Sequence, residues 1–242
     1  MRVLVVLPTY NESATIERML RRVRECLPAA DILVVDDSSP DGTAKLALEV
    51  GYELGRVEVL SRQAKEGLGP AYRAGFAWGL RRGYEAFVEM DSDFSHDPAD
   101  LPRLLAPLEQ GFDVAIGSRY VPGGSAPDWS WSRKLLSRWG NLYADFMLAL
   151  GVKDSTAGFR VYSARVLEKV DLGSVRADGY GFQIEMTYRA LLEGARIAEV
   201  PIRFVDRVEG SSKMSGRTVT EALWLVTAYG ARRLLERRRV RA

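Results

Sequence analysis

The sequence predicts an α/β fold with a mainly parallel sheet and helices on both of its faces. Over the first 120 residues, short apolar runs rich in β-branched side chains alternate with amphipathic helical patterns, a rhythm typical of right-handed βαβ units. Apolar residues make up 47% of the 242 residues, which is ample for the core of one large domain. Polar residues follow several apolar runs, at the strand ends where open parallel sheets bind ligands.

Each element is predicted by its own local pattern. The β-rich runs that predict strands are 2–7, 31–36, 57–60, 86–90 and 113–118. The patterns that predict helices lie near 13–26, 41–50, 68–82 and 99–108. Ser13 is the expected N-cap of the first helix, and Asp41 or Thr43 is expected to begin the second, because short oxygen-bearing side chains favour helix starts. The expected buried stripe of the first helix consists of Ile16, Met19, Leu20 and Val23.

Charge and cysteine content exclude several classes of protein. Lys and Arg (34) nearly balance Asp and Glu (32), so the chain lacks the dense basic surface that binds nucleic acid. Cys26 is the only cysteine, which excludes an intramolecular disulfide and a cysteine-cluster metal site. No apolar run reaches the roughly 18 residues expected of a spanning helix, and residues 1–8 indicate a first strand rather than a secretory signal. We therefore expect a soluble or peripheral protein.

Carboxylates stand at the ends of two predicted strands. Asp91 and Asp93 follow the apolar run 86–90. Asp36 and Asp37 follow the apolar residues 32–35. Period-two spacing places Asp91 and Asp93 on one face of an extended chain, and hard oxygen ligands suit Mg²⁺ or Mn²⁺ bridging a diphosphate. A single Asp-x-Asp is also an ordinary turn-forming sequence, but a second strand with the same ending favours a binding site.

Ordered motifs along nearly the whole chain support that interpretation. They are Pro8-Thr9-Tyr10-Asn11-Glu12, 35–43, Gly67-Leu68-Gly69, 90–93, 117–120, 154–160, 179–185, 204–207 and 211–213. In this set the chain resembles family 2 inverting glycosyltransferases, and within them the polyprenol (dolichol) phosphate mannose synthases. The resemblance implies a GT-A fold, a GDP-mannose donor and a polyprenyl phosphate acceptor.

The resemblance also implies roles for particular residues of the donor site. The residues expected around the nucleoside are Pro8, Tyr10, Glu12, Val35 and Asp37. Asp91, Ser92 and Asp93 would form the metal and diphosphate site, with Mg²⁺ or Mn²⁺ as cofactor. The cations expected to bind phosphates are Arg119, Arg207 and Lys213. At Ser95 the chain departs from relatives that carry Gln as a further metal ligand, so a hydroxyl or a water would complete the shell.

A phosphate acceptor requires alignment rather than a strong base, because its second pKa lies near ~6 and its oxygen is largely deprotonated at neutral pH. Arg119 and Arg133 are the expected acceptor clamps and are counted with Asp91 and Asp93 as catalytic; surface ion pairing is the alternative for both arginines. His96, the only histidine, would either transfer a proton or shape its loop, and the loop role is favoured.

Glu185 and the glycines Gly67 and Gly69 each have both a functional and a structural interpretation. Glu185 would orient a sugar hydroxyl or an arginine, or pair with Arg189 at the i+4 position. Gly67 and Gly69 do not complete a dinucleotide or P-loop motif, so we expect turn formation and close helix packing.

Two segments offer a route to a lipid acceptor. Residues 128–150 combine three tryptophans with basic residues, as in a helix lying at a membrane interface; a core helix would use the same aromatics for packing. Residues 219–231 precede an arginine-rich tail that begins at Arg232, which would bind an anionic surface or an integral membrane partner, or simply form a solvated helix end.

We accordingly expect a glycosyltransferase domain over 1–215, with 120–150 as its acceptor or membrane-interface segment, and an amphipathic helix with a basic tail over 216–242. The expected location is peripheral, at the cytoplasmic face of a membrane. Two other functions remain open, namely transfer of glucose or another hexose to the same lipid and a catalytically silent nucleotide-sugar binding subunit. The presence of Asp37, Asp91 and Asp93 argues against the silent subunit.

Overall fold

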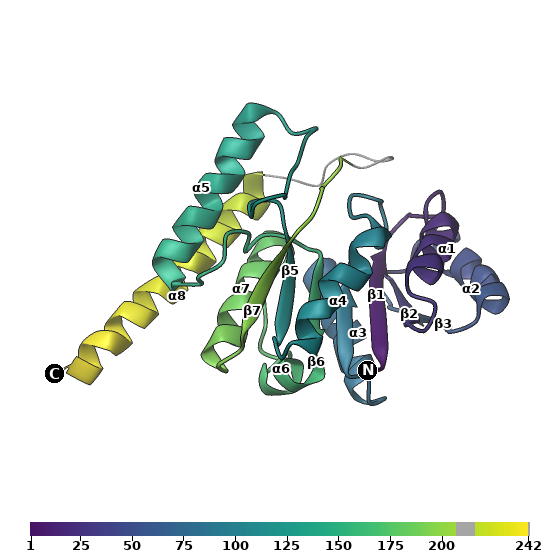
Figure 1. The fold of residues 1–242 in the computed structure, drawn as a ribbon, viewed down its shortest axis with the longest axis horizontal. Coiled ribbons are helices and arrows are strands. Elements are labelled where there is room, and N and C mark those ends of the chain that lie inside the picture. The colour runs from purple at the N-terminus through teal and green to yellow at the C-terminus, as the bar shows by residue number, and fades with distance from the viewer. Residues whose placement is uncertain (207–215, 242) are drawn as a thin grey trace.

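In the computed structural model, the backbone is described for residues 1–206 and 216–241, and the side chains for 1–206 and 219–235. One sheet runs through the molecule in the order β3-β2-β1-β4-β6-β5-β7 (Figure 1). The strands are β1 (Val3–Thr9), β2 (Asp31–Asp36), β3 (Val57–Ser61), β4 (Ala86–Glu89), β5 (Val114–Ser118), β6 (Arg160–Ser163) and β7 (Ile197–Pro201). The helices are α1 (Ile16–Cys26), α2 (Thr43–Leu54), α3 (Leu68–Leu80), η1 (Pro98–Asp100), α4 (Leu101–Glu109), α5 (Trp131–Leu148), α6 (Ala164–Lys169), α7 (Gly179–Leu192) and α8 (Gly216–Arg241).

The predicted α/β class is confirmed, and so is the mainly parallel sheet. β1 pairs in parallel with β2 and β4, β2 with β3, and β5 with β7. The exception is β6, which is antiparallel to both of its neighbours, β4 and β5. Three of its four residues are buried, so its sequence does not alternate apolar and polar residues as an antiparallel strand with one solvent-exposed face does. The strand was therefore not predicted.

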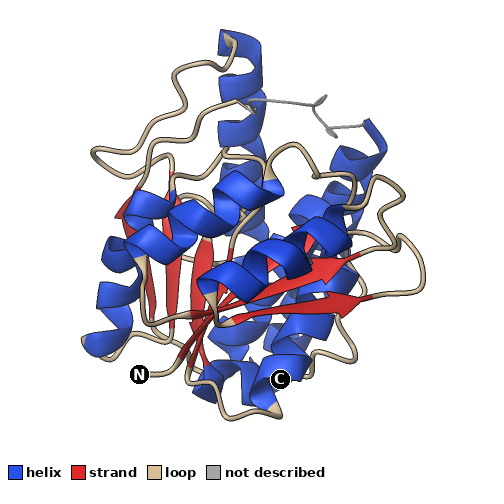
Figure 2. Ribbon diagram, turned by 90° about the vertical axis from the view of Figure 1, so that its right-hand side faces the viewer, coloured by secondary structure: helices blue, strands red, loops and turns tan. Residues whose placement is uncertain are grey.

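Helices cover both faces of the sheet (Figure 2). One buried apolar cluster joins the sheet to α3, α6 and α7 and reaches α5 and α8, while a second joins the other face to α1, α2 and α4. Burial on both faces explains why the parallel strands are almost continuously apolar in sequence. The predicted stripe of α1 is confirmed, since Ile16, Met19, Leu20 and Val23 are all fully buried.

The predicted N-cap of the first helix is wrong. α1 begins at Ile16, and Thr15 rather than Ser13 occupies the N-cap position. Residues 12–15 form a turn instead, because the backbone N–H of Ser13 donates to Asp41 Oδ2 at 3.0 Å and the N–H of Thr15 donates to Glu12 O. α2 begins at Thr43, whose N–H and hydroxyl both donate to Asp41 Oδ1. Asp41 thus joins the start of α2 to the loop after β1.

α5 and α8 pack against each other and extend beyond the edge of the sheet (Figure 1). α5 buries Asn141, Ala144 and Leu148, yet its other face leaves Trp131 76% and Phe146 82% exposed. It is therefore neither a core helix nor a fully solvated one. Within the described residues, no helix is long and apolar enough to cross a membrane.

Candidate functional site

A pocket of about 490 Å³ lies beyond the carboxyl ends of the strands, where the sequence placed it. It brings together loops after β1, β2, β4 and β5 with the start of α5 and α7. The predicted site residues that line it are Pro8, Tyr10, Glu12, Asp37, Asp91, Ser92, Asp93, Ser95, Arg119 and Arg133. His96 lines it as well. Residues from both the N-terminal and the C-terminal part of the chain therefore share one cavity.

Three predicted donor residues do not appear in that lining. The side chain of Val35 is fully buried and packs in the core beside Gly75 of α3. Val35 is on β2, and its side chain points into the helix-covered face rather than beyond the strand end. The side chain of Val35 therefore lies in the core, and a place for this residue beside the nucleoside stays a prediction. Arg207 and Lys213 lie outside the described residues.

The loop after β4 holds the carboxylates of Asp91 and Asp93 in a braced arrangement. Asp93 is 4% exposed and its Oδ1 accepts the backbone N–H of Ser95 at 3.0 Å. Asp91 Oδ1 accepts the hydroxyl of Tyr72 at 3.3 Å. Burial, together with the neighbouring Asp91, keeps the pKa of Tyr72 well above its ordinary value, so Tyr72 remains a hydrogen-bond donor. Contacts within the protein thus hold both carboxylates in place.

The donor set of this loop fits a hard divalent cation. Asp91, Asp93 and the hydroxyl of Ser95 all line the pocket, and carboxylate and hydroxyl oxygens are ligands that Mg²⁺ and Mn²⁺ accept. Among the described residues, no group of three or more His, Cys, Asp or Glu side chains is arranged to hold a metal ion. A cation here would therefore take its remaining ligands from a bound diphosphate and from water.

Asp37 lies at another part of the pocket and is held by its own cation. Its Oδ1 accepts from Arg62 Nη1 at 2.7 Å, and its Oδ2 accepts the N–H of Glu66 at 3.3 Å. Burial raises the pKa of Asp37 and outweighs the effect of Arg62. Lys65 lies 3.8 Å from the centre of the Tyr10 ring, and both side chains line the pocket. This end of the pocket combines an aromatic side chain with a carboxylate.

Arg119 is a buried arginine rather than the surface ion pair that was its alternative. It is 6% exposed and forms a two-pronged pair with Asp154, with Nε to Oδ2 at 2.7 Å and Nη2 to Oδ1 at 2.5 Å. Burial opposes its charge, but Asp154 outweighs burial and raises the pKa of Arg119. The ring centres of Trp129 and Phe204 lie 4.8 and 5.7 Å from its guanidinium carbon. Its Nη1 makes no hydrogen bond with any described residue, which leaves that end for a ligand.

Arg133 lies in the first turn of α5 and is half-buried. Its Nη1 donates to Asp206 at 2.9 Å, and its guanidinium carbon lies 4.2 Å from the ring centre of Trp129. Its Nε is buried and lacks a hydrogen-bond partner among the described residues. Trp129 therefore lies against both arginines, and the two cations face the same part of the pocket.

The contacts of His96 and Glu185 bear on the two roles that each was expected to have. His96 is buried and stacks on Phe159 at 5.0 Å between ring centres, with Phe204 edge-on at 5.5 Å; these contacts support the role in shaping the loop. Glu185 is 1% exposed and accepts hydrogen bonds from Arg189, Tyr229 and the N–H of Ala177. It does not line the pocket, so the pairing with Arg189 is the observed arrangement.

Comparison with known proteins identifies the family. The family model described as Glycosyl transferase family 2 matches residues 4–171. The chain belongs to this family. It is also 51% identical over 239 residues to the polyprenol monophosphomannose synthase of Mycolicibacterium smegmatis, covering 98% of this chain and 90% of the relative. The undecaprenyl-phosphate mannosyltransferase of Micrococcus luteus is 51% identical over 230 residues, covering 95% of this chain and 94% of the relative.

Solved structures show the same fold at lower identity. Glucosyl-3-phosphoglycerate synthase from Mycobacterium tuberculosis, in complex with Mn²⁺, UDP and its product, aligns with a TM-score of 0.70 at 22% identity, covering 95% of this chain and 80% of that one. A mannosyltransferase from Pyrobaculum calidifontis, in complex with GDP-Man and Mn²⁺, aligns with a TM-score of 0.59 at 16% identity, covering 97% and 74%. The glycosyltransferase therefore has the GT-A fold, as the resemblance implied.

A second cavity opens beside the first, between α5 and α8. It has a volume of about 80 Å³. Leu136, Tyr143, Leu223 and Val226 are among its walls, so it is largely apolar. Four residues line both cavities, namely Trp129, Arg133, Thr156 and Tyr180. The polar pocket of the glycosyltransferase thus continues into an apolar groove.

Sequence reasoning missed several residues of the pocket. Those not predicted include Lys65, Trp129, Thr156, Asp178, Gln183 and Phe204. Trp129 and Thr156 stood in segments already singled out, but no spacing rule indicates which tryptophan of 128–150 turns inward. Trp129 is 6% exposed whereas Trp131, two residues later, is 76% exposed. The change occurs because α5 begins at Trp131 and Trp129 still belongs to the preceding loop.

Proposed function

We propose that this glycosyltransferase transfers mannose from GDP-mannose, with inversion, to a polyprenyl phosphate. The observation that carries the proposal is the 51% identity, over almost the full length of each chain, to two relatives named as polyprenyl-type phosphate mannosyltransferases. The shape of the site supports it, because a pocket lined by carboxylates and arginines continues into an apolar groove. A sugar nucleotide fits the first cavity, and the phosphate end of a lipid fits the junction.

At the donor end, we assign the nucleoside to the part of the pocket formed by Tyr10, Glu12 and Asp37. The diphosphate would lie beside Asp91 and Asp93, which would hold the Mg²⁺ or Mn²⁺ ion. When bound, that cation supplies Lewis-acid stabilisation of the negative charge that develops on the leaving diphosphate. The braces from Tyr72 and Ser95 keep both carboxylates oriented before the substrate arrives, which is electrostatic preorganisation.

At the acceptor end, Arg119 and Arg133 would bind the lipid phosphate through charge-assisted hydrogen bonds. Arg119 offers Nη1, and Arg133 contributes the positive charge of a guanidinium that lines the pocket. The acceptor phosphate oxygen attacks the anomeric carbon from the face opposite the diphosphate, so the new carbon–oxygen bond forms as the bond to GDP breaks. A single displacement of this kind inverts the configuration. No protein base is needed, because the acceptor oxygen is already deprotonated.

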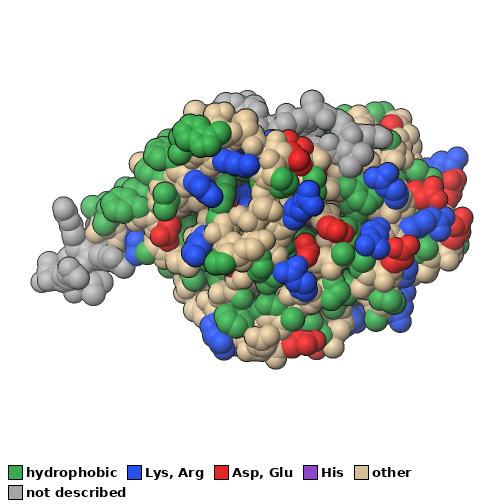
Figure 3. All heavy atoms as spheres, turned by 45° about the horizontal axis from the view of Figure 1, so that its top comes forward, with side chains coloured by type: hydrophobic (Ala, Val, Ile, Leu, Met, Phe, Trp, Pro, Cys, Tyr) green, Lys and Arg blue, Asp and Glu red, His purple; other side chains and the backbone are tan. Residues whose placement is uncertain are grey.

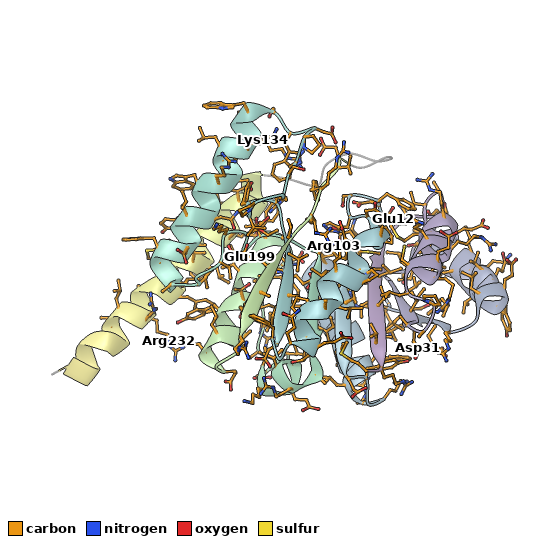
Figure 4. All side chains as sticks on the ribbon, viewed as in Figure 1. Glu12, Asp31, Arg103, Lys134, Glu199 and Arg232 are labelled. Carbon is orange, nitrogen blue, oxygen red and sulfur yellow. The ribbon has the colours of Figure 1, made fainter. Side chains whose placement is uncertain are left out.

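Access to the lipid would come through the exposed face of α5. Figure 3 shows hydrophobic side chains gathered along the side of the molecule that α5 forms, with Lys and Arg side chains beside them. The exposed apolar residues there are Trp131, Leu135, Leu136, Trp139, Leu142 and Phe146. Lys134 lies near the start of α5 and Arg232 on α8 (Figure 4). Aromatic and basic side chains together favour the interface of an anionic membrane, so we propose a peripheral location at its cytoplasmic face.

The test is transfer of radiolabelled mannose from GDP-mannose to a short polyprenyl phosphate in detergent. Parallel reactions contain Mg²⁺, Mn²⁺ or a chelator, and an unphosphorylated polyprenol serves as the acceptor control. We expect a metal-dependent lipid product only with the phosphorylated acceptor, and the anomeric configuration of that product, determined by NMR, tests inversion. Product from UDP-glucose but not from GDP-mannose would show that the donor assignment is wrong.

The rival from another class is a silent nucleotide-sugar binding subunit. It predicts nucleotide binding without transfer to any polyprenyl phosphate, with or without added membranes. The intact pair Asp91 and Asp93 in the pocket speaks against it. Calorimetric titration with GDP alongside the transfer assay separates the two functions.

A further inference from the structure

α5 carries one polar side chain on its buried face. Asn141 is 3% exposed and lies on the same helix as the buried Ala144 and Leu148. Burying an amide is costly unless its hydrogen bonds are made. Asn141 Nδ2 donates to Thr156 Oγ1 at 3.2 Å and to Ser137 O at 2.9 Å, and its Oδ1 accepts from Ser155 Oγ at 2.9 Å. Two of these three bonds tie α5 to residues 155 and 156.

The hydroxyl of Thr156 joins that amide to Arg119. Its Oγ1 accepts from Asn141 Nδ2 and from Arg119 Nη2, the latter at 2.8 Å, and donates to Asp154 Oδ1 at 3.3 Å. A threonine hydroxyl has one donor and two acceptor positions, so all of its capacity is used. Loss of one of these three partners would leave a buried hydrogen-bonding position of Thr156 unsatisfied, or would allow the Thr156 side chain to rotate away from the other two.

Asp154 is fixed from the opposite side, by the sheet. Glu199 of β7 (Figure 4) accepts the backbone N–H of Asp154 through Oε1 at 3.0 Å and that of Lys153 through Oε2 at 2.8 Å. The guanidinium of Arg119 is therefore held by the sheet through Asp154 and by α5 through Thr156 and Asn141. Thr156 also lines both the polar pocket and the apolar groove, at the junction where a lipid phosphate would lie.

We infer that Thr156 and Asn141 are positioning residues that aim the guanidinium of Arg119 at the phosphate of the lipid acceptor. The inference rests on the proposed function, because it concerns the acceptor of that reaction. Asp154 supplies the countercharge, and the Asn141–Thr156 pair sets the direction of the remaining N–H groups. The helix that carries the exposed apolar face thereby also fixes an acceptor-binding cation.

The central variants are Thr156→Val, which keeps the shape but removes the hydroxyl, and Thr156→Ser, which restores it. Tyr229→Phe is the matched control, because it removes a hydroxyl that joins α8 to Glu185 of α7 away from both cavities. Initial rates are measured while farnesyl phosphate and GDP-mannose are varied separately, and Tm is recorded for each variant. We expect Thr156→Val to raise KM for farnesyl phosphate about 10-fold, with KM for GDP-mannose within about 2-fold. Thr156→Ser and Tyr229→Phe should match the wild type in both.

A double variant tests whether the two residues act through one path. Asn141→Leu should raise the acceptor KM in the same direction as Thr156→Val, and the combined variant should be no worse than Thr156→Val alone. A lower Tm with an unchanged acceptor KM would assign both residues a purely structural role. Equal rises in both KM values would likewise overturn the inference.

Equilibrium binding of farnesyl phosphate without donor separates this inference from the proposed function. If the wild type binds farnesyl phosphate about 10-fold more tightly than Thr156→Val but makes no mannosyl product, the proposed reaction fails and the positioning role stands. If the wild type transfers mannose and both proteins bind the acceptor equally, the positioning role fails and the reaction stands. If the wild type neither binds farnesyl phosphate nor transfers mannose, both the proposed reaction and the positioning role fail.

Discussion

The proposed donor half and the proposed acceptor half of the pocket are built by different means. In the donor half, Asp91 and Asp93 follow directly from the end of β4, and their orientation depends on near neighbours such as Ser95, two residues away. In the acceptor half, Arg119 depends on Asp154, 35 residues later, and Arg133 on Asp206, 73 residues later. The end of β4 thus places both carboxylates, and Asp93 is oriented within its own loop, although Asp91 also takes a hydrogen bond from Tyr72, 19 residues earlier. Both arginines depend on partners that are more distant in the sequence.

The largest expected effect is loss of activity without loss of fold in the donor half. Asp93→Ala should lower kcat about 1,000-fold, because Lewis-acid stabilisation contributes several kcal/mol and each 1.4 kcal/mol is tenfold. The thermal unfolding curve should remain cooperative, since the surrounding sheet does not depend on this side chain. Mannosyl transfer measured across a Mn²⁺ titration provides the check.

Asp97→Ala is the matched control for that experiment. Asp97 is on the same loop, but its carboxylate accepts the N–H of Ala99 at the start of η1 and does not line the pocket. We expect loss of this cap to cost about 1 kcal/mol of stability and to leave kcat unchanged. Full activity of Asp93→Ala would remove the metal-site assignment and with it the contrast between the halves.

In the acceptor half, by contrast, loss of an arginine should affect stability and activity together. Arg119→Ala leaves Asp154, which is fully buried, without its cation, and breaking a buried pair in this way costs about 3–5 kcal/mol. Urea unfolding measures that cost, and the transfer assay measures the accompanying loss. Arg119→Lys should recover part of the stability but not the two-pronged geometry.

Arg133→Ala provides the comparison within the acceptor half. Its ion pair is partly exposed, with 21% of the Arg133 side chain and 47% of the Asp206 side chain accessible. We expect less than about 1 kcal/mol of destabilisation together with a raised KM for the lipid phosphate. If Arg119→Ala proved no more destabilising than Arg133→Ala, long-range burial would not be what distinguishes Arg119.

The same division explains what could be predicted from the sequence. All five predicted strands were found, because a run such as 32–35 is apolar throughout and is buried on both faces. Asp37, Asp91 and Asp93 line one pocket, as expected from the shared edge at which the carboxyl ends of parallel strands meet. That the side chain of Val35 points into the core could not be predicted, because the direction of a side chain near a strand end depends on register, which the sequence alone did not supply.

The acceptor half needed the structure. The partners of Arg119 are Asp154 and Thr156, and nothing local to residue 119 indicates them. β6 inserts between β4 and β5 in the opposite direction and carries the loop before it, 154–158, to the pocket. α5 was expected to be either interfacial or core, but one of its faces is buried and the other is exposed, because α8 covers only part of it.

The exposed apolar face of α5 can be tested against the rest of the acceptor half. Changing Trp131, Leu142 and Phe146 together to Ser should reduce binding to anionic phospholipid vesicles at least about 10-fold, because roughly 1.5–3 kcal/mol is lost even if only one of these large apolar side chains was buried in lipid. These side chains are 69–82% exposed, so Tm should change little. Vesicle co-sedimentation measures the binding.

Tyr52→Ser controls for the removal of any exposed aromatic side chain. Tyr52 is 92% exposed on α2, at the opposite end of the molecule from α5 (Figure 1). The Tyr52→Ser variant should bind vesicles as tightly as the wild type. Equal losses in both proteins would mean that the face of α5 has no special part in membrane binding.

The smallest expected effect on transfer concerns Glu89, a buried residue whose hydrogen-bond partner lines the pocket. Glu89 is on β4 and fully buried, and it accepts a hydrogen bond from Gln183, which lines the pocket from α7. Burial raises the pKa of Glu89 from 4.5 to about 8, although Arg160 acts in the opposite direction. Between these values the folded protein retains a proton that the unfolded chain has released.

Stability should therefore fall as pH rises from about 4.5 towards 8, with a slope from this group of about 1 kcal/mol per pH unit. Glu89→Gln removes the titrating group but keeps an oxygen for Gln183, so its urea-unfolding free energy should change less with pH, while transfer at pH 7 stays close to the wild-type rate. Glu58→Gln, on β3 and exposed, should retain the wild-type slope. An unchanged slope in Glu89→Gln would mean that Glu89 is already ionised at neutral pH, with the nearby Arg160 outweighing burial. The buried layer under the pocket would then be an ion pair of the same kind as that of Arg119 and Asp154.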